Sequence, residues 1–556
     1  MWSYSNSHYL INTPSRVEPS PMTTADVGLA ARAVNQWFPY VAHLSGFIVL
    51  YLITLAVQRL FLSPLAQIPG PKLAALTYYY QSYYELFPHR GQFLFRCEEL
   101  HKKYGPVIRI GPDEVHINDP WYWDETYPGP SRRRHKSPLF YWMGGIGSFG
   151  DQSMFTTLDH NHHRLRRAAL GTYFSKQKVR QLEPRLKSKV LLLKQRLLER
   201  KAPQSVNLKD AFSALTLDVI SMYSFGGSIG ALDRPDLGAS WNDLVHFAIK
   251  LNPFARAFPF LARQMLNLPK WTTSWSPSFQ GATEFIDIIF DLTRAAMDEA
   301  LADKSGGKGM DDADQRTVIH SMIQNDALPE HEKTLTRLAN DGLVLVAAGY
   351  ITTSSTLAVT MYHVLAKPHI RSRVLAELRT VMPTPASDLP SLVQLEQLPY
   401  LTAVIHEGTR VAHGAAGRHV RIAPDEDLSY SSRDGRWAYR IPSGTTFSQS
   451  IYLAHVNEEL YPRPWEFDPE RYYREDGSIT DAQRHLVAFG RGARQCVGTN
   501  LSWAELYLTI AALVGSLDME LAPETTEKEA TLASEFFVGL LPEDGPGIKV
   551  FVKGEL

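Results

Sequence analysis

The residues around Cys496 have the types and the spacing that favour an anionic sulfur. Glycines stand at positions 490, 492 and 498, and Arg491 and Arg494 come just before the cysteine. Glycine frees the backbone for a tight loop whose N–H groups can point at the sulfur, and arginine supplies positive charge that favours a thiolate. A lone cysteine is ordinarily a small buried apolar residue. This surrounding sequence instead predicts a thiolate site.

The same loop resembles the haem-binding loop of the cytochrome P450 family. Its residues match every fixed position of the family pattern FxxGxRxCxG: Phe489, Gly492, Arg494, Cys496 and Gly498. The resemblance implies that Cys496 is the axial ligand of the iron of haem b, to which a thiolate donates electron density. It also implies that Arg494 contacts a haem propionate.

Two further motifs match the family's buried ion network. Glu407 and Arg410 form an ExxR pair on a predicted helix, where the spacing of three residues puts acid and base on one face. Such a pair alone is common on solvated helices. The segment 464–473 resembles the family segment whose arginine completes the network, which makes Arg471 its third member. The resemblance implies that the network is structural and holds the haem loop in place.

A basic segment upstream resembles the family's WxxxR helix, whose side chains meet the haem propionates. In residues 162–175, His162 stands at the tryptophan position and Arg166 at the arginine position. Histidine can also donate to a carboxylate. If the register is shifted by one residue, His163 or Arg167 takes the role, and a solvated basic helix face is the alternative.

The family also supplies a propionate-binding basic residue after ExxR. Arg421 is the expected residue, and Arg418 is the second choice.

A long apolar segment, 343–357, carries small and hydroxyl residues in its middle. Its composition alone predicts a buried helix. It resembles the family's distal helix, with the pattern [AG]GxxT, through Ala348, Gly349 and Thr352, which Thr353 follows. The resemblance implies that the small residues let the helix approach the haem and that the two threonine hydroxyls help to deliver protons.

Ile351 departs from the family pattern, because an aspartate or glutamate usually stands there. The replacement removes one titratable proton source. Proton delivery must then rely on the two threonines, ordered water or a hydroxyl of the substrate. Hydroxylation is the default reaction, and desaturation, ring coupling or rearrangement stay open.

Most of the chain predicts helices, and a small part predicts strands. Helical apolar spacing occurs at 160–200, 208–224, 280–302, 334–366 and 391–412. Short strands are expected at 107–117 and 430–447. The architecture is therefore mainly α with a minor β component, and the resemblance implies the cytochrome P450 fold.

The N-terminal region differs in composition from the rest. No charged residue occurs from 33 to 58, and residues 38–57 are mostly apolar over the length of a bilayer-spanning helix. A buried core helix is the alternative. The expected organisation is a polar tail at 1–32, a transmembrane anchor at 33–58, a Pro-rich linker at 59–71 and a haem-thiolate catalytic domain at 72–556.

The charge balance and the cysteines restrict the partners. With 57 basic and 58 acidic residues, nothing indicates a nucleic-acid partner. Two cysteines far apart build no disulfide framework, which fits a reducing compartment. No flavin domain is visible, so the resemblance implies a separate NADPH–cytochrome P450 reductase. For an anchored member it implies a single-pass protein of the endoplasmic reticulum with its catalytic domain in the cytoplasm.

The sequence resembles fungal members of secondary metabolism through segments 159–175, 68–71 and 424–428. This similarity implies a monooxygenase acting on a hydrophobic terpenoid or polyketide-like substrate. A haem-thiolate isomerase or dehydratase is the second hypothesis, although such relatives tend to lose the threonine kept here at 352. A non-enzymatic haem sensor is the third. The mixed apolar and basic segment 253–271 is expected either to enter the membrane surface or to pack in the core.

Overall fold

The computed structural model describes residues 24–138, 152–200, 202–266, 277–306, 317–385, 388–474, 476, 478 and 480–556. The chain divides into two compact units, Met1–Ser63 and Pro64–Leu556.

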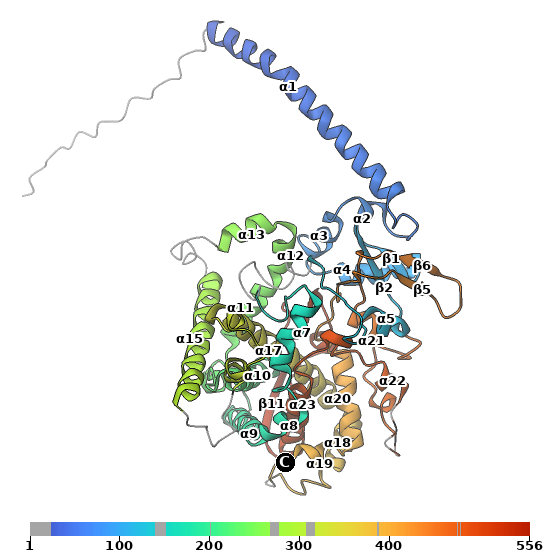
Figure 1. The fold of residues 1–556 in the computed structure, drawn as a ribbon. Helices are drawn as coiled ribbons and strands as arrows, with labels where there is room; N and C mark the ends of the chain where they lie inside the picture. Colours follow the sequence, from blue (N-terminus) through green and yellow to red (C-terminus); the bar gives the residue numbers. More distant parts are fainter. Residues whose placement is uncertain are drawn as a thin grey trace, which may run out of the picture. The chain divides into compact units, whose positions relative to one another are not determined.

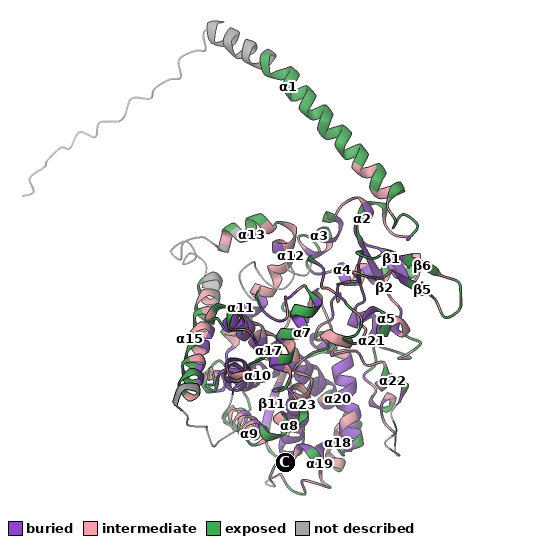
Figure 2. Cartoon of the chain, in the orientation of Figure 1, coloured by how far each residue is buried: buried purple, intermediate pink, exposed green. Residues whose placement is uncertain are grey.

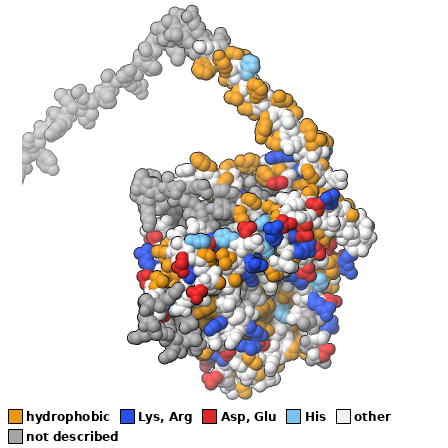
Figure 3. Space-filling view, viewed as in Figure 1, with side chains coloured by type: hydrophobic (Ala, Val, Ile, Leu, Met, Phe, Trp, Pro, Cys, Tyr) orange, Lys and Arg blue, Asp and Glu red, His pale blue; other side chains and the backbone are white. Residues whose placement is uncertain are grey.

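The first unit contains one long helix, α1 (Thr24–Val57), which continues as a π-helix over Gln58–Leu62. The segment Gln36–Leu62 has a mean hydropathy of 2.0 and no buried share in its most apolar window. Figure 2 shows most of the helix from residue 36 onward as exposed, and Figure 3 shows apolar side chains along that part. An uncovered apolar helix longer than about 20 residues can cross a bilayer. The segment therefore fits the predicted transmembrane anchor.

The polar tail differs in part from the prediction. Residues 24–32 belong to α1, so they are helical rather than loose. Residues 1–23 lie outside the described part of the chain.

The expected linker, 59–71, also differs, because its second half belongs to the folded second unit. Leu65 and Ile68 are buried in an apolar cluster with residues of the neighbouring sheet. The carbonyl of Pro69 accepts a hydrogen bond of 2.7 Å from the Arg109 N–H. The second unit thus begins at Pro64, because apolar burial fixes the Pro-rich segment.

The second unit is mainly helical (Figure 1). Its helices are α2 (Lys72–Leu76), α3 (Tyr79–Glu85), α4 (Phe93–Tyr104), α5 (Trp123–Thr126), α7 (His160–Gly171), α8 (Lys176–Gln181), α9 (Glu183–Glu199), α10 (Leu208–Phe225), α11 (Ala239–Lys250), α12 (Asn252–Ala257), α13 (Pro259–Leu266), α15 (Pro277–Gly306), α16 (Val318–Gln324), α17 (Leu335–Ala366), α18 (Pro368–Leu378), α19 (Leu392–Leu395), α20 (Pro399–Val411), α21 (Ile451–His455), α22 (Asp481–Arg484) and α23 (Thr499–Ser516).

The strands form small sheets. The largest has the order β1 (Val107–Arg109), β2 (Glu114–Ile117), β7 (Thr446–Ser448), β4 (Arg421–Ile422). β1 and β2 pair antiparallel within the segment 107–117 that was expected to form strands, and β2 runs parallel to β7 with Glu114 opposite Thr446. The other sheets are β3 (Ser205–Asn207) with β11 (Lys549–Glu555) and β8 (Leu517–Leu521), β5 (Leu428–Ser431) with β6 (Ala438–Ile441), and β9 (Ser534–Phe536) with β10 (Val538–Leu540).

The core of the second unit surrounds α17. This helix is apolar enough to span a membrane, but 72% of its most apolar window is buried, so it is a core helix. It packs on α10, α15, α20 and α23, and its N-terminus is capped by Thr334, whose hydroxyl accepts from the Arg337 N–H. Since α23 starts just after Cys496, the packing of α17 on α23 fixes the distal motif relative to the cysteine loop.

Candidate active site

The cysteine loop is a tight turn directly before α23. The Cys496 N–H donates to the carbonyl of Phe489 at 2.8 Å, and the Gln495 N–H donates to the carbonyl of Gly492 at 3.1 Å. The Phe489 ring lies 5.2 Å from the Trp503 ring of α23, centroid to centroid. The loop is therefore held by its own backbone and by the helix behind it.

The backbone conformation at position 492 and the lack of space for a Cβ there both require a glycine. Its φ of 72° lies in the left-handed region, and a Cβ there would stand 2.2 Å from the carbonyl oxygen of Tyr127 and 2.3 Å from that of Pro128. The neighbouring Ala493 N–H donates to the same Pro128 carbonyl at 3.1 Å. Only glycine lets the loop approach this backbone so closely.

The Cys496 sulfur lies in a mixed electrostatic environment. Burial among protein atoms raises the pKa of its thiol, while the Gly498 N–H, the charge of Arg167 and the Thr499 hydroxyl lower it. The side chain is nevertheless exposed. The residue is therefore accessible to a ligand, although protein groups lie close to its sulfur.

Five basic side chains gather near this loop. They come from four separate parts of the chain: Lys136, His163, Arg167, Arg421 and Arg494. Burial and the repulsion from Arg421 lower the pKa of Arg494 to about 8, and burial lowers the pKa of Arg421 to about 10. Burial likewise holds the pKa of Lys136 well below its usual range.

Three of these side chains are arginines without a carboxylate partner. In the described part of the chain, Arg167, Arg421 and Arg494 form no ion pair with an acid, and the buried Nε of Arg494 has no hydrogen-bond partner. Buried cations that repel one another need a counter-charge. The donors present therefore fit a dianionic group such as the two propionates of haem, next to a sulfur that can ligate iron.

His162 and Arg166, predicted to face the propionates, lie elsewhere. Glu332 accepts from Arg166 Nε at 2.8 Å and from His162 Nε2 at 2.6 Å. The structure thus supports the register shifted by one residue, in which His163 and Arg167 face the cysteine loop. A helix turns about 100° per residue, so adjacent residues of α7 point to different neighbours.

The two candidates for the propionate-binding residue after ExxR, Arg421 and Arg418, lie in different environments. Arg421 is buried beside the other cations, with its guanidinium 5.3 Å from the centre of the Tyr127 ring. Arg418 instead forms a buried ion pair with Glu114. Lys136 was missed by sequence reasoning, because no motif surrounds it.

The structure brings Glu407, Arg410 and Arg471 together as predicted. Arg410 donates to both carboxylate oxygens of Glu407 at 2.7 Å, and Arg471 Nε donates to Glu407 Oε1 at 3.3 Å. Arg410 also donates to the carbonyls of His455 and Pro464. Glu407 and Arg410 are fully buried, so each ion depends on the others for its compensation.

The distal motif spreads over three faces of α17. Ala348 is exposed in the middle of an otherwise buried helix, and the half-buried Thr352 donates to its carbonyl at 2.9 Å. Gly349 faces α10 instead, since a Cβ there would stand 2.8 Å from Ile220. Thr353 faces α23, where its hydroxyl lies 3.2 Å from the Ser502 hydroxyl. Of the two threonines, Thr352 is therefore the one on the exposed face of α17.

Comparison with known proteins decides the family. The family model described as cytochrome P450 matches residues 69–549. The chain belongs to the cytochrome P450 family. It is 59% identical to the cytochrome P450 monooxygenase ucsK of Acremonium sp, over 91% of this chain and 96% of that protein.

Two further P450 relatives are more distant. The cytochrome P450 monooxygenase tpcC of Cochliobolus heterostrophus is 38% identical over 91% of this chain and 95% of its own length. The N-acetyltryptophan 6-hydroxylase ivoC of Emericella nidulans is 34% identical over 92% and 97%. Membership of this P450 family confirms the predicted fold class, the oxidoreductase activity and, at family level, the haem iron.

Proposed function

We propose that this P450 is a membrane-anchored monooxygenase that oxidises a hydrophobic secondary metabolite with O2 and electrons from NADPH–cytochrome P450 reductase. The observation that carries the proposal is the group of three arginines without a carboxylate partner, Arg167, Arg421 and Arg494, near the exposed Cys496. Its cofactor would be haem b, with Cys496 on the iron and Arg494, Arg421, His163, Arg167 and Lys136 toward the propionates. Once bound, the haem supplies the thiolate-ligated iron at which O2 is activated.

The chain's own residues shape the distal side. Thr352 holds a proton at Oγ1, one helical turn after the exposed Ala348, so its hydroxyl can pass protons at the open face of α17. Ile351 is buried and carries no titratable group. Thr353, bonded to Ser502, stands behind that face and can exchange a proton only toward α23.

Hydroxylation is the favoured outcome. The retained Thr352 argues against an isomerase or dehydratase, and the hydroxylase named among the relatives shares 34% identity with this chain. Desaturation stays the second candidate, because the apolar Ile351 leaves the relay without an acid.

Membrane attachment is proposed at two places. The first is the apolar segment Gln36–Leu62. The second is an exposed apolar patch on the second unit, formed by Leu73 of α2, Tyr79 of α3, and Phe258, Phe260 and Leu261 around α12 and α13. The Tyr79 and Phe258 rings lie 6.3 Å apart, so the patch is continuous there. This supports membrane contact for residues 258–261 of the predicted segment 253–271, of which residues 267–271 lie outside the described part of the chain. We further propose that the membrane is the endoplasmic reticulum and that the catalytic unit lies on its cytoplasmic side.

The decisive experiment is co-expression of the full chain with the reductase in microsomes. We expect the reduced, CO-bound protein to show the Soret band of thiolate ligation and to consume NADPH while forming a product one oxygen heavier. Cys496→Ala should lose the band. A band retained in Cys496→Ala, or an intact band without any NADPH-dependent product from extracts of the producing organism, would overturn the proposal.

A further inference from the structure

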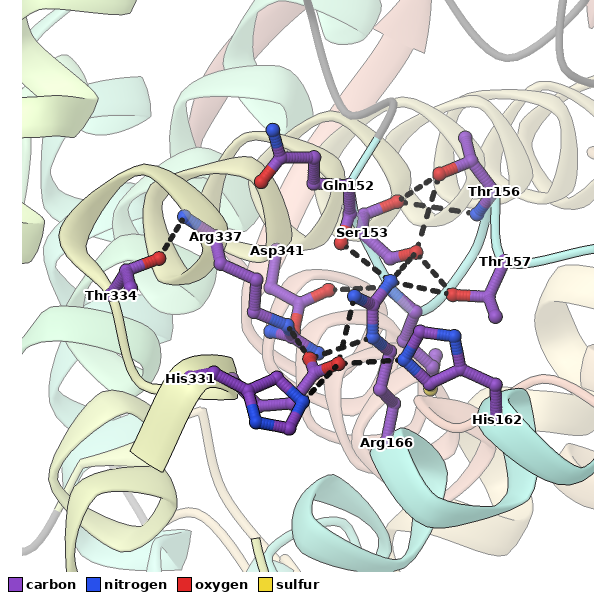
Figure 4. A network of polar contacts seen from close by, with 12 residues as sticks. Gln152, Ser153, Thr156, Thr157, His162, Arg166, His331, Thr334, Arg337 and Asp341 are labelled. Carbon is purple, nitrogen blue, oxygen red and sulfur yellow. Dashed lines mark hydrogen bonds and ion pairs between the residues drawn. The ribbon is translucent and has the colours of Figure 1, made fainter. Parts of the chain in front are cut away.

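A buried polar network joins α7 to the start of α17 (Figure 4). Its centre is Glu332, the last residue of a short 3-10 turn, Glu330–Glu332, before α17. Glu332 accepts from Arg166 Nε at 2.8 Å, from Arg337 Nε at 2.8 Å and from His162 Nε2 at 2.6 Å. One carboxylate thus connects α7 with the first turn of α17.

The charges of the network balance. Arg166 and Arg337 face Glu332 and Asp341, and all four side chains are at most 10% exposed. Burial would raise the pKa of Glu332, but hydrogen bonds from Arg166 and His162 and the charges of both arginines lower it to about 2. Removing one member leaves a buried arginine without its counter-ion.

The same network holds the segment 152–159, which leads into α7. Arg166 Nη1 donates to the carbonyl of Gln152 at 2.8 Å and to the Thr157 hydroxyl at 2.9 Å. The Met154 N–H donates to Asp341 at 2.7 Å. The segment is therefore fixed from the network side by two ionic side chains.

Arg494 of the cysteine loop also binds the segment 152–159, through its backbone carbonyls. Its Nη1 donates to the carbonyl of Thr157 at 2.7 Å, and its Nη2 donates to that of Leu158 at 2.9 Å. Thr157 is thus contacted by Arg166 through its hydroxyl and by Arg494 through its carbonyl. A shift of this segment would move Arg494.

We propose that Glu332 is a positioning residue for the cofactor site. By holding Arg166 and His162, it fixes the rotation of α7 that turns His163 and Arg167 toward Cys496. Through Arg166 it also fixes segment 152–159, and thereby Arg494. The inference rests on the proposed haem site, because His163, Arg167 and Arg494 are the residues that would bind the propionates there.

The test compares holoenzyme variants by the rate of haem transfer to an excess of an apo-haem acceptor protein. Glu332→Gln keeps the shape of the side chain and removes its charge, and we expect about tenfold faster haem release, because the buried Arg166 and Arg337 lose their counter-ion. Glu332→Asp keeps the charge and should release haem at a rate between those of the wild type and Glu332→Gln. Glu330→Gln is the matched control, because that side chain is 82% exposed in the same turn, and it should release haem at the wild-type rate.

A double-mutant cycle separates positioning from general destabilisation. If Glu332 acts by orienting α7, Glu332→Gln should raise the rate of haem release only slightly further in a protein that already carries Arg167→Gln. If the two residues act independently, their effects on the free energy of activation for release should sum. If Glu332→Gln does not fold, His162→Gln provides a milder variant, because the His162 side chain is half-exposed. It should also speed haem release, but by a smaller factor.

Four outcomes are decisive. Faster release with non-additivity supports the inference. Wild-type release rates in Glu332→Gln, or full additivity with Arg167→Gln, would overturn it. A wild-type protein without a thiolate Soret band would instead overturn the proposed function.

Discussion

At the scale of single residues, the cysteine loop depends on one glycine that no other residue can replace. Gly492→Ala should lower the free energy of unfolding by about 3 kcal/mol or more, because the added methyl meets two carbonyl oxygens and the backbone is left-handed. Denaturant unfolding and the reduced CO spectrum measure the loss.

Gly435 provides the control for this prediction. Its φ of 70° is the same, but a Cβ there meets nothing within 4 Å. Gly435→Ala should therefore cost only the conformational term, about 1–2 kcal/mol. Equal losses in the two variants would show that the contact with Tyr127 and Pro128 is unimportant.

The two distal threonines should differ in function. Thr352→Val should lower the ratio of product to NADPH by about tenfold or more and raise peroxide release, because a positioned proton donor is lost. Thr353→Val should keep the ratio near that of the wild type, since its hydroxyl bonds Ser502. Parallel assays of NADPH oxidation, product and peroxide decide this, and similar uncoupling in both variants would contradict it.

At the scale of elements, the docking of α7 against α17 should depend on pH. The folded pKa of Glu332, about 2, lies below its ordinary value of 4.5. Its contribution is therefore complete above about pH 4.5 and is lost as the pH falls toward 2; the shift corresponds to about 3 kcal/mol. Unfolding of wild type and Glu332→Gln between pH 7 and about pH 3 should show a stability gap that narrows with acid. A constant gap would mean that another group carries the effect.

The rotation of α7 about its axis could not be predicted from the sequence. The cysteine loop and the ExxR network were predicted residue by residue, because their motifs resemble those of the family at each fixed position. In α7, basic or histidine side chains stand at His162, His163, Arg166 and Arg167, so the polar pattern does not define which pair faces inward. The deciding partner, Glu332, lies 166 residues away from Arg166.

Similar reasoning explains Gly349, Thr353 and Lys136. The distal motif places small and hydroxyl residues correctly on α17, but adjacent positions differ by about 100° around the helix. Only the packing partners, Ile220 for Gly349 and Ser502 for Thr353, show which way each points. Lys136 joins the site by chain topology, which no local pattern encodes.

At the scale of the whole molecule, the second unit contains its own core and should fold without the first. A chain of residues 64–556 should keep the thiolate Soret band and the wild-type unfolding midpoint, because Gln36–Leu62 has no buried share in its most apolar window. We expect it to retain weak affinity for vesicles, which sedimentation measures, and Phe260→Ser with Leu261→Ser should abolish that affinity. Tight vesicle binding by the double variant would assign attachment to another surface.

The buried arginines near Cys496 have a consequence for the amount of this protein in its cell. Burial lowers the pKa of Arg421 and Arg494, so their charged forms destabilise the folded chain until an anion binds. A ligand that binds only the folded chain stabilises it in proportion to the logarithm of its concentration. Haem supply should then set how much of this chain escapes proteolysis, so that the cellular level of the enzyme follows iron and porphyrin synthesis even when its messenger is constant.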